Sequence, residues 1–171
     1  MVIETVQLFA KYNAATNRKM NAILSSLTVD QWKKEFGGFF KSVEALCNHI
    51  YIADFNWLKR LSGLRSFSYI KAPLFHRSIA FDQMLFGNVD EYISMRDGLD
   101  EQVTGFAGEL RNDDLAMELK YLDSRGNEFT KNFGGLIMHM LNHQTHHRAM
   151  ISLYLEEMGI ANDYSSLSGL L

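Results

Sequence analysis

The sequence predicts an all-α fold, a four-helix bundle with non-simple connectivity and a small β-hairpin before the last helix. Only one proline, Pro73, occurs in 171 residues, which suits long helices because proline breaks them. Long segments carry apolar residues at helical spacing, and connections of unequal length join them, which does not fit a simple up-down-up-down order. Another compact all-α fold is the alternative, and in either case residues 1–171 are expected to form a single domain.

Four segments have the apolar spacing of helices: residues 3–26, 42–61, 89–110 and 132–158. Ser42 is a suitable N-cap for the second of them, and Gly63 follows its end. Gly159 is placed to end the last helix at the C′ position.

The connections between these helices carry turn residues. Residues 28–38 are expected to form a short turn, and residues 63–87 an irregular segment with some helical turns. A loosely alternating stretch is interrupted by Ser124–Asn127, so a small hairpin is expected across residues 115–131. The tail, residues 160–171, is expected to pack loosely.

The composition excludes several classes of protein. The net charge is −3 and no Lys/Arg-rich stripe occurs, which argues against a nucleic-acid partner. No apolar run approaches the roughly 20 residues needed to cross a bilayer, and the N-terminus lacks the pattern of a signal peptide. The single cysteine, Cys47, allows no intramolecular disulfide, so a cytoplasmic location is expected.

Histidines are concentrated in the last predicted helix. Four of the six lie close together there: His139, His143, His146 and His147. The apolar seam of that helix consists of Phe133, Leu136, Met140, Met150 and Tyr154. His143 and His147 continue this seam through its gap, so two imidazoles are expected to occupy successive layers of the core.

This placement favours a metal site. A buried imidazole without a partner costs roughly 1–3 kcal/mol, and a divalent cation removes that cost for both rings. A spacing of four residues puts His143 and His147 on one face of the helix, as in metal-binding helices of metalloproteases. The alternative is that these are ordinary core histidines satisfied by hydrogen bonds.

A third ligand is expected from a facing helix. His49 is the only histidine of the second helix, on a face shared with Leu46, Ala53 and Asn56. Three histidines leave a coordination position open for water or substrate, which is typical of catalytic metal sites. Zinc or nickel is the preferred metal, with iron or manganese as alternatives.

The other histidines are not the preferred metal ligands. A pair of His139 with His143 is possible, but His139 lies at the flank of the seam, so a supporting or structural place is preferred. His146 is expected at the helix flank, and His76 on the surface.

Further polar residues offer weaker candidates for the site. Gln144 follows His143 where metalloproteases have a glutamate, and because an amide is a poor base, hydrolysis by that mechanism is disfavoured. Asp54, five residues after His49, is expected to face away and to pair elsewhere. Cys47 is expected to be a buried inert thiol, and Arg148 to form an ordinary salt bridge. Core positions, instead of substrate contacts, are expected for Tyr51, Trp57 and Tyr154.

Two of these segments resemble the DinB/YfiT-like superfamily. Residues 141–148, Leu-Asn-His-Gln-Thr-His-His-Arg, resemble the signature of its final helix. Residues 39–61 resemble its second-helix motif, and the order, spacing and chain length agree over essentially the whole chain. The resemblance departs at Ala149 and Met150, where family members commonly have Gly-Gln, so any ligand-positioning role of that glutamine is absent here.

The resemblance implies a four-helix bundle of unusual connectivity with a metal held by His49, His143 and His147. It also implies a homodimer, and in some members a transferase or isomerase that uses a low-molecular-weight thiol. Other members are described only as damage-inducible proteins or as metal-dependent hydrolases. A metal-dependent enzyme, a non-catalytic metal-binding or stress-associated protein, and a metal-free interaction module are therefore the three hypotheses.

Overall fold

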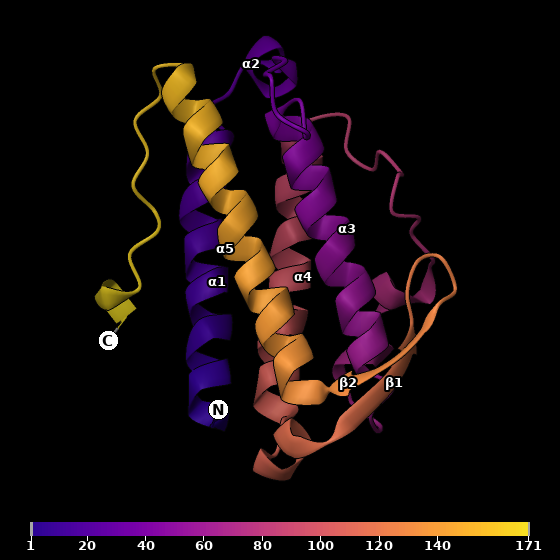
Figure 1. Ribbon diagram of the computed structural model, residues 1–171. Helices are drawn as coiled ribbons and strands as arrows, with labels where there is room; N and C mark the ends of the chain where they lie inside the picture. The colour runs from indigo at the N-terminus through magenta and orange to yellow at the C-terminus, as the bar shows by residue number, and fades with distance from the viewer. Residues whose placement is uncertain (1, 171) are drawn as a thin grey trace.

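The computed structural model describes residues 2–170 and contains a bundle of long helices (Figure 1). The long helices are α1 (Ile3–Leu24), α3 (Val43–Leu61), α4 (Val89–Glu109) and α5 (Phe133–Glu157). A short helix, α2 (Val29–Lys33), follows α1, and the antiparallel strands β1 (Glu118–Leu122) and β2 (Glu128–Asn132) precede α5. The predicted all-α four-helix bundle with a hairpin before its last helix is confirmed. Within the described residues, no helix is long and apolar enough to cross a membrane.

The helices are not connected in simple up-and-down order. Helix α1 packs against α4 and α5, and α3 packs against the same two helices, so α1 and α3 lie diagonally across the bundle (Figure 1). Residues 62–88, the return segment, run back along α3 after that helix ends. Side-chain-to-backbone hydrogen bonds fix this segment to α3 at three points: Lys59–Arg77, Asn56–Ile79 and Asn48–Leu85. Because the chain returns in this way, α3 and α4 run in the same direction.

Local capping explains where the helices begin and end. Ser42, Asn88 and Asn132 each accept a hydrogen bond from the backbone N–H three residues later, at 3.1, 2.9 and 2.8 Å. At the end of α5, Gly159 has a φ of 74°, a left-handed conformation that glycine adopts without strain.

The stretch after α1 was expected to be a turn but contains α2. Thr28 and Gln31 form a reciprocal capping box, which satisfies backbone donors at the start of this short helix. Trp32 is 2% exposed and anchors α2 in the core. Five residues are too few for a recognisable apolar period, which is why the sequence pattern missed this helix.

The expectation of a loosely packed tail is wrong for its middle part. Tyr164 is buried and donates a hydrogen bond to the carbonyl of Arg148 at 2.9 Å. Tyr12 donates to the carbonyl of Ser165 at 2.7 Å. These contacts hold the tail against α1 and α5.

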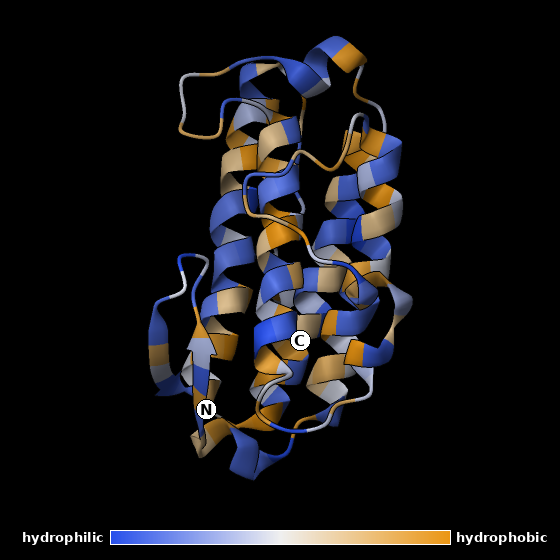
Figure 2. Ribbon diagram, turned by 90° about the vertical axis from the view of Figure 1, so that its right-hand side faces the viewer, coloured by the Kyte–Doolittle hydropathy of each residue, from blue (hydrophilic) through white to orange (hydrophobic). Residues whose placement is uncertain are grey.

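Polar side chains cross the core between all four long helices. Hydrophilic and hydrophobic residues alternate along the helices (Figure 2), and several of the hydrophilic residues are buried. The polar layer, as we call it, consists of Asn13, Asn17, Asp54, Arg96, Asp100, Gln144 and Arg148, all buried. It lies beside the candidate site and is connected to it through α5.

Candidate metal centre

Three histidines converge between α3 and α5. His49 lies in the second turn of α3, and His143 and His147 lie one turn apart on α5. The Nε2 atom of His143 is 3.2 Å from Nε2 of His49 and 3.0 Å from Nε2 of His147. One ring nitrogen from each residue lies within 4.8 Å of the others. The structure therefore brings together the three residues predicted from the sequence.

The two nitrogen separations that involve His143 fit ligands of one metal ion, and the third pair, His49 and His147, lies within 4.8 Å. With metal–nitrogen bonds of about 2.05 Å, two ligating nitrogens lie about 3.3 Å apart at tetrahedral angles and about 2.9 Å apart at octahedral angles. The observed 3.0 and 3.2 Å lie between these values. The histidines could thus hold a metal ion without a large rearrangement of either helix.

The protonation state of the rings also suits a metal. Burial, with a smaller effect of the neighbouring histidines, lowers the pKa of His143 to about 4 and that of His147 to about 3. Burial lowers the pKa of His49 as well. Neutral imidazole offers the lone pair that a metal needs. Nδ1 of His143 and Nδ1 of His147 are buried and have no hydrogen-bond partner in the part of the chain described, so no protein acceptor fixes the tautomer.

An aromatic side chain covers the histidines on one side. The ring of Phe40 lies 4.3 Å from that of His49 and 5.3 Å from that of His147, between centroids. The hydroxyl of Tyr154 donates to the carbonyl of Phe40 at 2.6 Å and fixes this loop. A methyl group at Gly38 would overlap that hydroxyl, so the close approach of the loop requires glycine there. The loop thus shields the triad from water with a fixed apolar ring.

A cavity of about 130 Å³ opens beside His49. The return segment forms one wall with Phe81, Asp82, Gln83 and Met84, and Phe40 lines the other side. Asp82 is the carboxylate in this lining, and the sequence reasoning missed it because it lies in an irregular segment without a periodic pattern. The cavity opens onto His49, the member of the triad in its lining, and places the carboxylate of Asp82 beside it.

The polar layer fixes the other face of the same turns of α5. Gln144 Oε1 accepts hydrogen bonds from Asn17 at 3.1 Å and from Arg148 at 2.9 Å. Asn17 also donates to both carboxylate oxygens of Asp100 at 3.0 Å. The residues that follow the two histidines of α5 are therefore tied to α1 and α4, which holds the histidine face toward α3.

The polar candidates from the sequence have structural places. Asp54 faces away from the histidines, as expected, and pairs with Arg96 at 2.6 Å, both side chains being 0% exposed. Burial raises the pKa of Asp54 to about 6. The expected salt bridge of Arg148 is wrong, because its hydrogen-bond partners in the described residues are neutral amide and hydroxyl oxygens. Cys47 is buried, as expected.

The remaining histidines do not join the cluster. His139 and His146 are exposed on α5, and His76 is exposed in the return segment, as predicted. The ring of His139 lies 5.9 Å from that of His143 and 5.1 Å from that of Trp57. Trp57 was expected in the core but is only half-buried and lines a pocket with His139. Tyr51 and Tyr154 are core residues, as expected.

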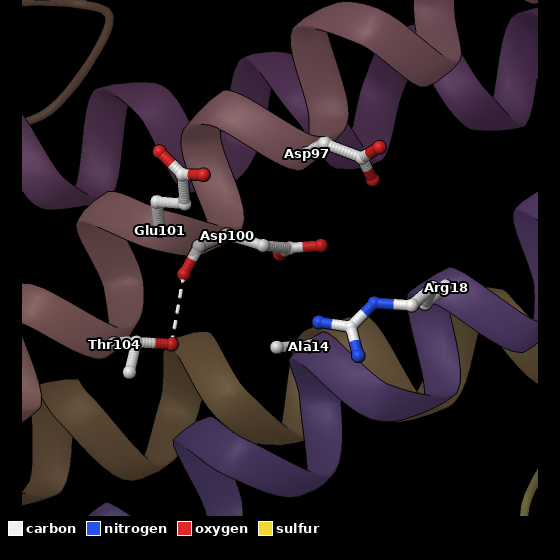
Figure 3. A pocket seen from close by; sticks show the side chains of 6 residues that line it. All are labelled: Ala14, Arg18, Asp97, Asp100, Glu101 and Thr104. Carbon is white, nitrogen blue, oxygen red and sulfur yellow. Dashed lines mark hydrogen bonds between the residues drawn. The ribbon is translucent and has the colours of Figure 1, made fainter.

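A larger cleft, of about 460 Å³, lies between α1 and α4 and is lined by none of the three histidines. Figure 3 shows Arg18 of α1 facing Asp97, Asp100 and Glu101 of α4 across this cleft. Its lining is mostly charged, and Asp100 also belongs to the polar layer. It is separate from the candidate metal centre.

A helical bundle with a return segment and three converging histidines defines a class of candidate metalloproteins. A family model described as the DinB family matches residues 1–164, and the chain belongs to this family. The fold is similar to that of a DinB-like protein from Bacillus subtilis, with 14% identity, a TM-score of 0.61 and coverage of 92% of this chain and 96% of that one. A DinB-like protein from Bacillus cereus has 16% identity, a TM-score of 0.61 and coverage of 91% and 95%. No curated protein matches this chain.

Proposed function

We propose that this chain binds one divalent metal ion through His49, His143 and His147 and uses the remaining coordination position for chemistry on a small molecule. The observation that carries the proposal is the convergence of three neutral imidazoles, with Nε2 atoms 3.0 and 3.2 Å apart, beside an open cavity. Zinc or nickel is the proposed metal, and iron or manganese are the alternatives, since imidazole suits all four.

The proposed reaction is thiol S-transfer, in which the sulfur of a low-molecular-weight thiol forms a bond to an electrophilic carbon of a small molecule while the bond from that carbon to its leaving group breaks, and the thiol proton is released to solvent. A metal with an open position binds a thiol as its thiolate, which is the nucleophilic form. Such a transfer needs no dedicated base at the metal, and the polar residues beside the triad, Gln144 and Arg148, are engaged in the polar layer. Supporting this reading, the family resemblance includes thiol-dependent transferases.

One observation favours a metal-dependent hydrolase as the second candidate. Asp82 lines the cavity beside His49 and is an acid that can accept a proton from water. Loss of hydrolysis with retained thiol consumption in Asp82→Asn would separate the two reactions. A metal-loaded protein that is inert toward every thiol and ester tested would favour the third reading, a non-catalytic metal-binding protein. A cytoplasmic homodimer remains part of the proposal from the resemblance and the cysteine content.

Titration of the metal-free protein with zinc and nickel, in competition with a coloured chelator, tests the metal site. We expect one equivalent bound, with affinity reduced about 100-fold or more in each of His49→Ala, His143→Ala and His147→Ala, because each ligand contributes a large share of the binding free energy. His139→Ala and His146→Ala are matched controls on the same helix and should bind within about threefold of the unsubstituted protein, since neither contacts the metal. Full metal binding by the three ligand variants would disprove the assignment.

A further inference from the structure

A further pocket, of about 410 Å³, lies where Trp57 of α3 and the β-hairpin meet the first turns of α5. The half-buried rings of Trp57 and Tyr121 face it, with ring centroids 5.6 Å apart, and His139 stands at its edge. Gly135 and Leu136, in the first turn of α5, complete its wall. Volume and lining are those of a site for a small molecule with an aromatic group.

Two cations lie at this pocket, Lys131 in its lining and Arg60 beside its aromatic rings, and the carboxylate of Asp123 lies near Arg60. Lys131 lines it and forms no ion pair with any residue from 2 to 170. The guanidinium of Arg60 lies 5.1 Å from the centre of the Trp57 ring and 5.9 Å from that of Tyr121. Its one hydrogen bond runs from Nε to the carbonyl of Leu122 at 3.1 Å, which leaves its terminal nitrogens free to donate. No carboxylate lines the pocket, so it is complementary to an anion.

His139 lies between the pocket and the histidine triad. The ring of His139 contacts Trp57 on one side, at 5.1 Å between centroids, and lies 5.9 Å from that of His143 on the other. Gly135 and His143 are eight residues apart on α5, so about 12 Å of helix separates the floor of the pocket from the nearest candidate ligand. The pocket and the candidate metal centre therefore lie on the same helix, about two turns apart.

We propose that this pocket binds the aromatic part of a small anionic molecule, with its ring between Trp57 and Tyr121 and its anionic group near Lys131 and Arg60. That the pocket holds part of the substrate of the metal centre rests on the proposed function. Binding of the anionic aromatic group in the pocket does not need the metal. The substrate class is thus an aromatic acid, or a conjugate that carries one.

Titration of the metal-free chain with naphthoate, followed by amide shifts in the ¹H–¹⁵N NMR spectrum, tests this inference. We expect saturable shifts at the amides of Gly135, His139 and Tyr121. Gly135→Leu fills the pocket, and a Cβ there meets only Asn132 Oδ1 at 3.5 Å, so the fold tolerates it. This variant should weaken naphthoate binding by about tenfold or more, which corresponds to the loss of most contacts of one ring.

Two controls make the result specific. Gly98→Leu places the same side chain on α4, where a Cβ meets nothing within 4 Å, and should leave naphthoate affinity unchanged. Lys131→Gln should weaken naphthoate but not the neutral naphthylmethanol. Shifts centred elsewhere, or undiminished binding by Gly135→Leu, would overturn the inference. Metal titration of the same samples separates the two proposals. Naphthoate binding without metal binding would refute the proposed function alone. Metal binding without naphthoate binding would refute the proposed pocket alone.

Discussion

Replacing the buried Arg148 by methionine should destabilise the protein by about 3 kcal/mol. Arg148 is 3% exposed and donates to Asn13 Oδ1, and to Asn17 Oδ1 at 3.2 Å, two oxygens with no other hydrogen bond in the polar layer. Each buried acceptor left without a donor costs about 1–3 kcal/mol, so two of them cost about 2–6 kcal/mol. Methionine also avoids the cost of burying a guanidinium, which places the expected loss in the lower half of this range.

Thermal and urea unfolding of the metal-free protein measure this loss. A change of 3 kcal/mol corresponds to a melting temperature lower by roughly 6–12 °C in a chain of this size. Arg18→Met is the matched control, because Arg18 is exposed and has no ion pair among residues 2–170, and it should change stability by less than about 0.5 kcal/mol. Adding Asn13→Leu to Arg148→Met should recover part of the loss, since one orphaned acceptor disappears. A melting temperature of Arg148→Met equal to that of Arg18→Met would refute this account of the polar layer.

Four further outcomes follow from the structure. Gly38→Ala should displace the Tyr154 hydroxyl that fixes Phe40 over the histidines, and should weaken metal binding severalfold. Gly37→Ala, in which the added Cβ meets no atom within 4 Å, should bind metal normally. Equal metal affinities of the two variants would contradict the role of Phe40. The histidine pKa values are lower in the folded than in the unfolded chain, so the metal-free protein should lose stability as the pH falls below 6.5 toward about 4 and 3, the values of His143 and His147. Urea unfolding midpoints measured across this pH range test the expected loss of stability. A double variant with alanine at both His143 and His147 should show a weaker dependence of stability on pH. Adding zinc should raise the melting temperature as ligand concentration increases, and a chelator should reverse the change; a melting temperature independent of zinc would speak against a site in the folded state. Cys47, whose pKa burial raises, should react with a thiol reagent only after unfolding, and rapid labelling of the native protein would show that the interior opens.

The histidine triad could be predicted from the sequence because two of its members lie close together on one helix. A spacing of four residues and a position in an apolar seam are properties of one helix, so His143 and His147 could be assigned without knowing the fold. His49 followed because it is the single histidine of the facing helix. Contacts in the structure bear out this geometry, whereas the metal itself stays a proposal.

The buried residues of the polar layer could not be predicted from the sequence in the same way. Pattern reasoning takes apolar residues as the buried face of a helix, so it gives no reason to place Asn13 and Asn17 of α1 in the core. Both asparagines are 0% exposed, because Arg148 and Asp100 on other helices satisfy them. These hydrogen-bond partners lie more than 80 positions away in the sequence, so no short segment of the sequence reveals them. Asp82 was missed for a related reason, since its position depends on how the return segment lies on α3.

The two sides of the triad come from distant parts of the chain. His49 lies on α3, and its partners lie on α5, the last long helix, with His49 and His143 94 positions apart in the sequence. During synthesis, α3 is complete long before α5 exists, so a nascent chain contains only His49 of the three until α5 is made, and the three imidazoles converge only when α5 docks. Under the proposed function, metal uptake through all three histidines is therefore a late event that requires a completed bundle. A chain truncated before α5, or one in which α5 has not packed, would lack the three-histidine site.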